Sequence, residues 1–267
     1  MFISELFPGI RWLRPLMDLV YPRSCLLCAK PIIDFDQESI CGRCDSQIVP
    51  TTHGCLRCSA PLPANQRQEA KTCFYCRSRK WSFRHAYCYT VYSGLAARGA
   101  RQIKQPTCES LAIALGHRVG KWLTHVEHFD RSQYDCVVPI PQHWFRRVTV
   151  RYNQADVLAE NIAKALSLPI ERNWLFRTRW TEKQGTKTIS ERRTSLVNSF
   201  GCHSKWEVQG IRILIVDDIV TSGATADDAA RAMRKAGAKQ IDVAAFARGV
   251  SARRQKSEKN SLAQPES

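Results

Sequence analysis

Four CxxC pairs near the start of this 267-residue chain constrain its fold more than any other feature. Two residues between cysteines allow one tight turn to aim both sulfurs at a single ion about 2.3 Å away. Twelve residues separate the first two pairs and fourteen the last two, each enough for a short hairpin. We therefore expect two successive structural Zn²⁺ sites, with Cys25, Cys28, Cys41 and Cys44 in one and Cys55, Cys58, Cys73 and Cys76 in the other.

Spacing alone leaves other uses of these cysteines open. An interleaved pattern would join the first pair to the third, and four thiolates can also hold an iron–sulfur cluster. Disulfides are disfavoured because the opening residues lack the pattern of an export signal, so a reducing, cytoplasmic location is expected. His53, beside the third pair, is expected to be a loop residue rather than a ligand. The unpaired cysteines are expected to be buried thiols: Cys88, Cys108, Cys136 and Cys202.

Composition divides the chain into four expected segments. Residues 1–22 are apolar but interrupted by charges, which predicts a helical segment with at most a membrane-surface role, near the inner face of the membrane. Residues 23–80 would form a double zinc ribbon that depends on metal for its stability. Residues 81–250 would form the main domain, and the polar residues 251–267 a disordered tail.

Alternating strands and helices in the main domain predict an α/β fold with a doubly wound parallel sheet. The apolar run IRILIV is typical of a parallel strand covered on both faces. Gly237 is expected to follow the end of a helix. Hydrophobic periodicity places strands at 86–92, 136–141, 211–216 and 240–246, and helices at 95–104, 109–123, 153–166 and 224–236.

Two adjacent acids, Asp217 and Asp218, follow the apolar run and precede a loop of hydroxyls and glycine. Ligands of open α/β sheets bind beyond the carboxyl ends of the strands, where these acids are expected. The N-terminus of the following helix offers unpaired N–H groups to a phosphate. Carboxylates accept hydrogen bonds from vicinal hydroxyls. A ligand with a sugar next to a phosphate therefore explains both the acid pair and the hydroxyl-rich loop. The cradle residues are Thr221, Ser222, Gly223, Ala224 and Thr225.

The stretch VDDIVTSGAT resembles the 5-phosphoribosyl-1-pyrophosphate (PRPP) signature of type I phosphoribosyltransferases. With the CxxC module, VVPIP, YNQADVLA and a loop carrying Gln184, Glu191 and Arg192, the chain resembles the competence protein F (ComF) family of amidophosphoribosyltransferase-like proteins. The resemblance implies that Asp217 and Asp218 bind the ribose hydroxyls of PRPP, with Mg²⁺, and that residues 221–225 hold the 5-phosphate. It also implies a pyrophosphate site near Pro139 and a mobile loop over residues 177–193.

The resemblance further implies a role in natural transformation or DNA utilisation, on incoming single-stranded DNA and alongside other uptake proteins. The formal charge of +16 agrees with a polyanionic partner. Whether the protein transfers phosphoribose to an acceptor stays open, and no catalytic base is evident. An inactive PRPP-sensing or nucleic-acid-binding adaptor and an iron–sulfur protein are the alternatives. Basic segments with interleaved aromatics supply the candidate DNA contacts: Trp144, Arg146, Arg147, Arg151 and Trp180.

Overall fold

The computed structural model describes residues 23–32, 39–62, 73, 76–77, 79–142, 152–178, 199–203 and 205–249. The segments 1–22 and 251–267, for which a helix and a disordered tail are expected, lie outside this range. Within it, no helix is long and apolar enough to cross a membrane.

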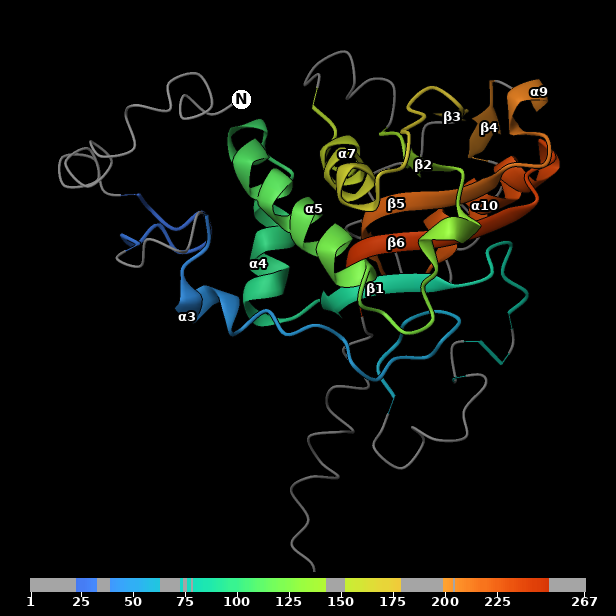
Figure 1. The fold of residues 1–267 in the computed structure, drawn as a ribbon. Helices are drawn as coiled ribbons and strands as arrows, with labels where there is room; N and C mark the ends of the chain where they lie inside the picture. The colour runs from blue at the N-terminus through green and yellow to red at the C-terminus, as the bar shows by residue number, and fades with distance from the viewer. Residues whose placement is uncertain are drawn as a thin grey trace, which may run out of the picture.

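A four-stranded parallel sheet forms the centre of the molecule, in the order β1-β6-β5-β2 (Figure 1). Its two middle strands are the longest, and their residues are almost all buried. Apolar side chains on both faces of each strand agree with a parallel sheet that is covered on both sides. The strands are β1 (Ala86–Val91), β2 (Cys136–Pro139), β5 (Arg212–Val220) and β6 (Gln240–Arg248).

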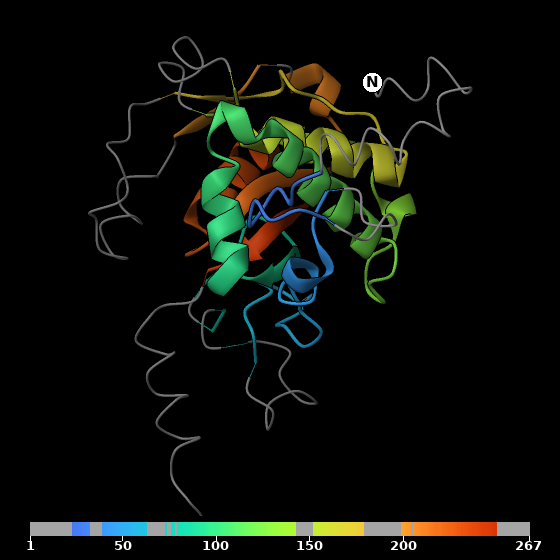
Figure 2. The same ribbon diagram turned by 90° about the vertical axis from the view of Figure 1, so that its left-hand side faces the viewer.

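Three helices cover one face of the sheet: α4 (Gly94–Gln102), α5 (Glu109–Leu123) and α7 (Gln154–Leu166). Figure 2 looks onto this face, with α4 and α5 in front of the strands. Two glycines let α5 and α7 approach closely, because a Cβ at Gly116 would lie 2.9 Å from a backbone oxygen of α7 and one at Gly120 only 2.5 Å from a side chain.

The opposite face packs against α10 (Ala224–Lys235) and a small antiparallel pair, β3 (Leu175–Arg177) and β4 (Phe200–Cys202). Helices on both faces of a parallel sheet confirm the doubly wound α/β architecture. The remaining elements are short: α3 (Gly42–Asp45), α9 (Lys205–Val208), and the 3₁₀ turns η3 (Pro106–Cys108) and η4 (Arg131–Gln133).

The two cysteine-rich segments lie against opposite faces of the sheet. Cys25 and Cys44 belong to the core that contains α4, α5 and α7. Cys55, Cys58, Cys73 and Cys76 belong to the core that contains α10. The stretch between the segments covers the outer edge of β1, where Thr51 N–H donates to the carbonyl of Tyr89 at 2.6 Å. Without this cover, the edge strand would expose a row of unpaired N–H and C=O groups.

The expected elements are present, with shifted ends. Strand β5 continues to Val220, four residues beyond the predicted end, because β6 also extends and pairs with it as far as Arg248. Asp217 and Asp218 therefore lie inside the strand and not beyond it, which corrects the expectation. Gly237 follows α10 with φ +100°, as expected for the end of a helix. The strands β3 and β4 were not predicted from periodicity, since each has three residues.

Candidate functional site

The acidic segment and the hydroxyl turn form one continuous unit, β5–turn–α10. The turn ends at Gly223, whose φ of +76° favours glycine, and the 12-residue helix begins at Ala224. The N–H of Ala224 donates to the hydroxyl of Ser222 at 3.3 Å, which satisfies the first N–H of the helix, whereas the N-cap residue Gly223 has no side chain to cap it. The first N–H groups of such a helix attract anions. The structure thus brings the predicted cradle residues together at a helix N-terminus.

The two acids differ in their surroundings. Asp218 is 7% exposed and accepts a hydrogen bond from Nε2 of Gln154 at 3.1 Å, while Nζ of Lys104 lies 3.3 Å from its carboxylate. Burial, together with the negative charge of Asp218, raises the pKa of Asp217 to about 8. Below about pH 8, a magnesium ion or sugar hydroxyls would therefore meet a protonated Asp217.

Lys104 and Gln154 were not among the predicted site residues. Lys104 follows α4, and Gln154 begins α7, so helices distant in sequence bring both to the end of β5. The spacing of nearby residues does not indicate this position for either of them. For Gln154 the family resemblance did give a signal, because this residue belongs to the YNQADVLA stretch.

Arg177 is the last residue of β3; burial lowers its pKa, and interaction with Asp217 and Asp228 opposes this. The expectation placed it at the start of the mobile loop, and the pairing of β3 with β4 corrects this. The chain returns at Ser199, whose N–H donates to the buried carboxylate of Asp228 at 2.7 Å. Both ends of the segment 179–198 are thus fixed beside β5 and α10. Gln184, Glu191 and Arg192 lie outside the described residues.

The cysteines group by sequence order into two four-sulfur sets, 25/28/41/44 and 55/58/73/76, and in each the sulfurs lie within 4.8 Å of one another. This excludes the interleaved arrangement. Sulfurs around one tetrahedral zinc ion lie about 3.8 Å apart when each Zn–S bond is about 2.3 Å. The separations are 3.8 Å between Cys28 and Cys41, 3.9 Å between Cys55 and Cys76, and 3.4 Å between Cys58 and Cys73. Each set therefore fits one zinc ion of its own.

An N–H group donates to at least one sulfur in each set. Burial opposes the ionisation of Cys25, but backbone N–H groups, with that of Cys41 at 3.3 Å, lower its pKa to about 6. In the second set, the indole N–H of Trp81 donates to the sulfur of Cys76 at 3.4 Å. N–H donors to sulfur stabilise the charged ligand form. His53 belongs to neither set, as expected.

The four unpaired cysteines fall into two classes. Cys88 and Cys136 are buried, at 0% and 3% exposure, and burial raises the pKa of both thiols. Cys108 and Cys202 are only half-buried, which corrects the expectation for them. Both lie at the ends of short elements, where fewer neighbours cover the side chain.

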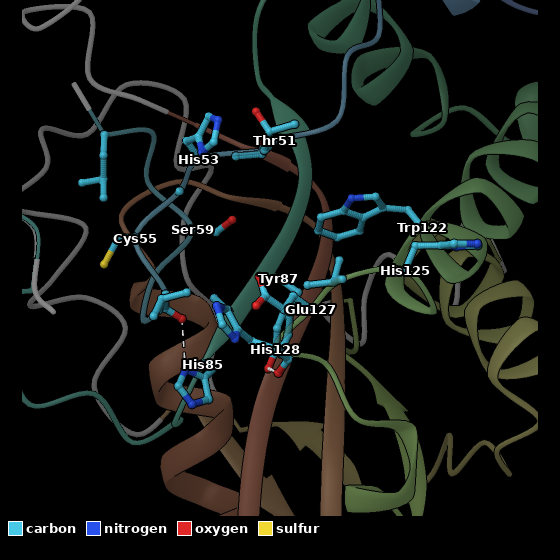
Figure 3. A pocket seen from close by; sticks show the side chains of 16 residues that line it. Thr51, His53, Cys55, Ser59, His85, Tyr87, Trp122, His125, Glu127 and His128 are labelled. Atoms are coloured by element: carbon cyan, nitrogen blue, oxygen red, sulfur yellow. Dashed lines mark hydrogen bonds between the residues drawn. The ribbon is translucent and has the colours of Figure 1, made fainter. Parts of the chain in front are cut away.

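A groove of about 1060 Å³ lies at the start of β1, between the second cysteine segment and the end of α5. Four histidines and a tryptophan line it, and Figure 3 shows His53 and His125 on opposite sides of the view, with His85 below His53. Nδ1 of His85 lies 3.0 Å from the carbonyl of Leu56. Among the described residues, only the two cysteine sets bring three or more metal-ligand residues within reach of one ion. This groove is separate from the β5–α10 turn.

The predicted DNA contacts are not described by the structure. Trp144, Arg146, Arg147, Arg151 and Trp180 all lie outside the described residues. They stay predictions, as does the pyrophosphate turn beyond Pro139, of which only the first residues are described. The N–H of Ile140 there donates to the carbonyl of Val216 at 2.8 Å, which holds this turn against β5.

Comparison with known proteins gives two domain matches. The phosphoribosyl transferase domain matches residues 154–263, and the double zinc ribbon domain matches residues 16–77. The first match contains the β5–α10 unit, and the second contains all eight cysteines of the two sets. These matches agree with the α/β sheet and with the two four-cysteine sets.

Curated relatives are named for competence and for DNA utilization. Competence protein F of Haemophilus influenzae is 33% identical over 115 residues, which cover 43% of this chain and 50% of that protein. The chain thus spans about half the length of this relative. DNA utilization protein YhgH of Escherichia coli K12 is 25% identical over 230 residues, covering 84% of this chain and 96% of that protein. The Salmonella typhimurium protein of the same name is 24% identical with the same coverage.

Several solved structures match part of the chain at low TM-scores. Glutamine PRPP amidotransferase from B. subtilis matches with a TM-score of 0.35 and 20% identity, covering 51% of this chain and 26% of that one. Purine phosphoribosyltransferase from Pyrococcus horikoshii matches with a TM-score of 0.30 and 17% identity, covering 52% and 73%. Similarity at this level adds no argument to the domain matches.

The domain matches and the relatives agree with the geometry of the sheet and the cysteine sets. The chain is a homologue of competence protein F and of the YhgH DNA utilization proteins, and along it the match to the double zinc ribbon domain precedes the match to the phosphoribosyl transferase domain.

Proposed function

We propose that this protein binds PRPP at the β5–α10 turn and acts in the utilisation of incoming single-stranded DNA. One observation carries the first part: a pair of strand-borne acids leads through a short turn into the N-terminus of a 12-residue helix. The acids suit vicinal hydroxyls and the helix start suits a phosphate, and PRPP presents both on one ribose. The names of the relatives support the second part.

In this proposal Asp217 and Asp218 accept hydrogen bonds from the ribose hydroxyls of PRPP. Thr221, Ser222, Gly223, Ala224 and Thr225 hold the 5-phosphate through backbone N–H groups and hydroxyls. Mg²⁺ would enter with PRPP and supply charge neutralisation at the pyrophosphate. Lys104, at 3.3 Å, and Gln154, at 3.1 Å, both contact Oδ2 of Asp218 and orient its carboxylate, while Oδ1 accepts from the N–H of Ile219.

Transfer, if the protein is an enzyme, would break the bond between C1 of the ribose and pyrophosphate and join C1 to an acceptor atom. Such a reaction depends on positioning and on stabilising the departing pyrophosphate. Arg177 interacts with the charges of Asp217 and Asp228, and the sequence of residues 179–193, which lie outside the described residues, adds further basic side chains. The acceptor and a general base are not assigned. Release of pyrophosphate from PRPP in the presence of candidate acceptors separates an enzyme from a PRPP-sensing adaptor.

Calorimetry with Mg²⁺ and PRPP tests the binding proposal. The wild-type protein should bind, and Asp217→Asn/Asp218→Asn should show no measurable heat while retaining its thermal unfolding transition. Lys239→Gln, a surface change at the opposite end of the sheet, is the matched control and should bind as the wild type does. Equal affinity of the wild type and the double variant would refute the assignment.

Single-stranded DNA binding is supported by the formal charge of +16 and by the names of the relatives. We assign the contacts to Trp144, Arg146, Arg147, Arg151 and Trp180, and place the protein in the cytoplasm, where uptake delivers such strands. Affinity should fall with salt, at about −0.7 in log–log slope per neutralised phosphate. Arg146→Ala/Arg147→Ala should reduce that slope. Salt-insensitive binding, or an unchanged slope, would refute this assignment.

A further inference from the structure

The second cysteine set and the β5–α10 turn share a buried arginine. Arg248, at the end of β6, is 1% exposed. Its Nε donates to the carbonyl of Cys58 at 2.8 Å, and its Nη1 donates to the carbonyls of Val220, at 2.9 Å, and of Thr221. One guanidinium therefore joins the cysteine knuckle to the first two carbonyls of the turn.

Trp81 makes a second connection. Its indole N–H donates to the sulfur of Cys76, and its ring lies so close to Gly223 that a Cβ there would be 2.8 Å from it. The guanidinium of Arg79 lies 4.9 Å above this ring and donates to the carbonyl of Ser222. The residues that follow the last cysteine thus hold the third carbonyl of the turn and leave room only for glycine at its end.

These contacts orient the N–H groups of the turn. In a trans peptide, the N–H of each residue points opposite to the carbonyl of the residue before it. The arginines hold the carbonyls of Val220, Thr221 and Ser222 on the side of the second cysteine set. The N–H groups of the next three residues are then directed to the other side of each peptide plane. Successive N–H groups held in this way form an anion-binding concavity.

The first cysteine set has different neighbours. Leu27 lies 3.1 Å from the position that a Cβ on Gly99 of α4 would take, and Arg118 of α5 forms an ion pair with Asp45. Cys25 and Cys44 pack into the core on the face of the sheet opposite α10. This set is therefore supported by helices α4 and α5, away from the β5–α10 turn.

We propose that the second cysteine set, and not the first, positions the phosphate-binding turn, so that PRPP affinity depends on the metal held by Cys55, Cys58, Cys73 and Cys76. This inference rests on the proposed PRPP function. Loss of this metal would free the Cys58 knuckle and the sulfur partner of Trp81. The arginines would then no longer hold the three carbonyls, and the N–H groups would lose their common direction.

Matched cysteine variants test the inference. Cys76→Ser and Cys41→Ser each remove one ligand from one set, and metal analysis should find about one zinc in each variant instead of two, as four ligands per ion require. PRPP affinity should fall by about tenfold or more in Cys76→Ser, because charge-assisted N–H bonds to phosphate are lost, and change by less than about twofold in Cys41→Ser. Equal losses, or a larger loss in Cys41→Ser, would overturn the proposal.

Two further measurements cover other outcomes. If Cys76→Ser does not fold, Trp81→Phe, which retains the ring but removes the N–H donor, should still weaken PRPP binding severalfold with two zinc ions bound. Unchanged affinity in Trp81→Phe would contradict the proposal. Amide hydrogen exchange of residues 219–224 reports on the turn without PRPP. It should accelerate in Cys76→Ser and not in Cys41→Ser, even if the wild type fails to bind PRPP and the proposed function is wrong.

Discussion

The two cysteine sets have the same ligands and similar spacing but differ in what surrounds them. In the first, Cys28 and Cys41 are half-buried, whereas all four cysteines of the second are buried. The first packs on helices, and the second packs on the turn that joins β5 to α10. Identical metal chemistry can therefore support a peripheral module in one case and a binding turn in the other. The difference comes from the neighbours, which the cysteine spacing does not specify.

Replacing the arginine beside each cysteine set should give the largest difference between the sets in the cost to the free energy of unfolding. Arg248→Gln removes a buried guanidinium that four carbonyls accept from, including that of Gly249, and should cost about 3 kcal/mol or more of unfolding free energy. Arg118→Gln removes an ion pair with Asp45, whose side chain is 44% exposed, and should cost about 1 kcal/mol or less. Denaturant unfolding measures both. Similar costs would remove the energetic contrast between the two sets.

Two glycines with nearly the same φ allow the cost of backbone strain to be measured separately from the cost of side-chain crowding. Gly223 and Gly210 have φ of +76° and +77°, but only Gly223 has a side chain within 4 Å, the ring of Trp81. Gly210→Ala should cost about 1 kcal/mol from backbone strain alone. Gly223→Ala should cost about 1–3 kcal/mol more because of overpacking, and should weaken PRPP binding. Equal costs in thermal or denaturant unfolding would show that Trp81 does not press on the turn.

The acid pair predicts a pH dependence. The pKa of Asp217 is raised from 3.8 to about 8, so the folded protein holds a proton that the unfolded chain releases above about pH 4. Stability from this group is therefore lost as pH rises from about 4 to 8. Asp217→Asn stays neutral, so its unfolding free energy relative to wild type should rise with pH, by up to about 1.4 kcal/mol per unit. A flat difference between about pH 6.5 and 8 would contradict the raised pKa.

Lys104 should give the smallest effect on stability. Its side chain is 41% exposed, so losing its ion pair with Asp218 in Lys104→Met should cost less than about 1 kcal/mol. Its charge also lowers the pKa of Asp217, so the variant should move that pKa further up. The unfolding-versus-pH curve would then shift to higher pH. An unchanged curve would show that Lys104 does not act on the acid pair.

Sequence reasoning reached the sheet, four of its helices and both metal sets because each has a local signal. The apolar run before Asp217 predicts a buried strand, and the CxxC spacing predicts the ligands. The prediction from the sequence ended β5 too early. The additional residues of β5 pair with β6, which lies beyond α10 in the sequence. Lys104 and Arg248 were missed for a related reason. Each reaches the site only through tertiary packing, and a lone basic residue in a chain of charge +16 carries no local signal.

Stepwise removal of zinc from the native protein tests the central claim most directly. The half-buried first set should release its ion to a chelator before the buried second set, because its cysteines are more accessible. PRPP affinity, measured against zinc content, should stay constant from two ions to one and fall as the last ion leaves. A steady fall from the first ion onward, or unchanged affinity in metal-free protein that remains folded, would contradict the assignment of different roles to the two cysteine sets.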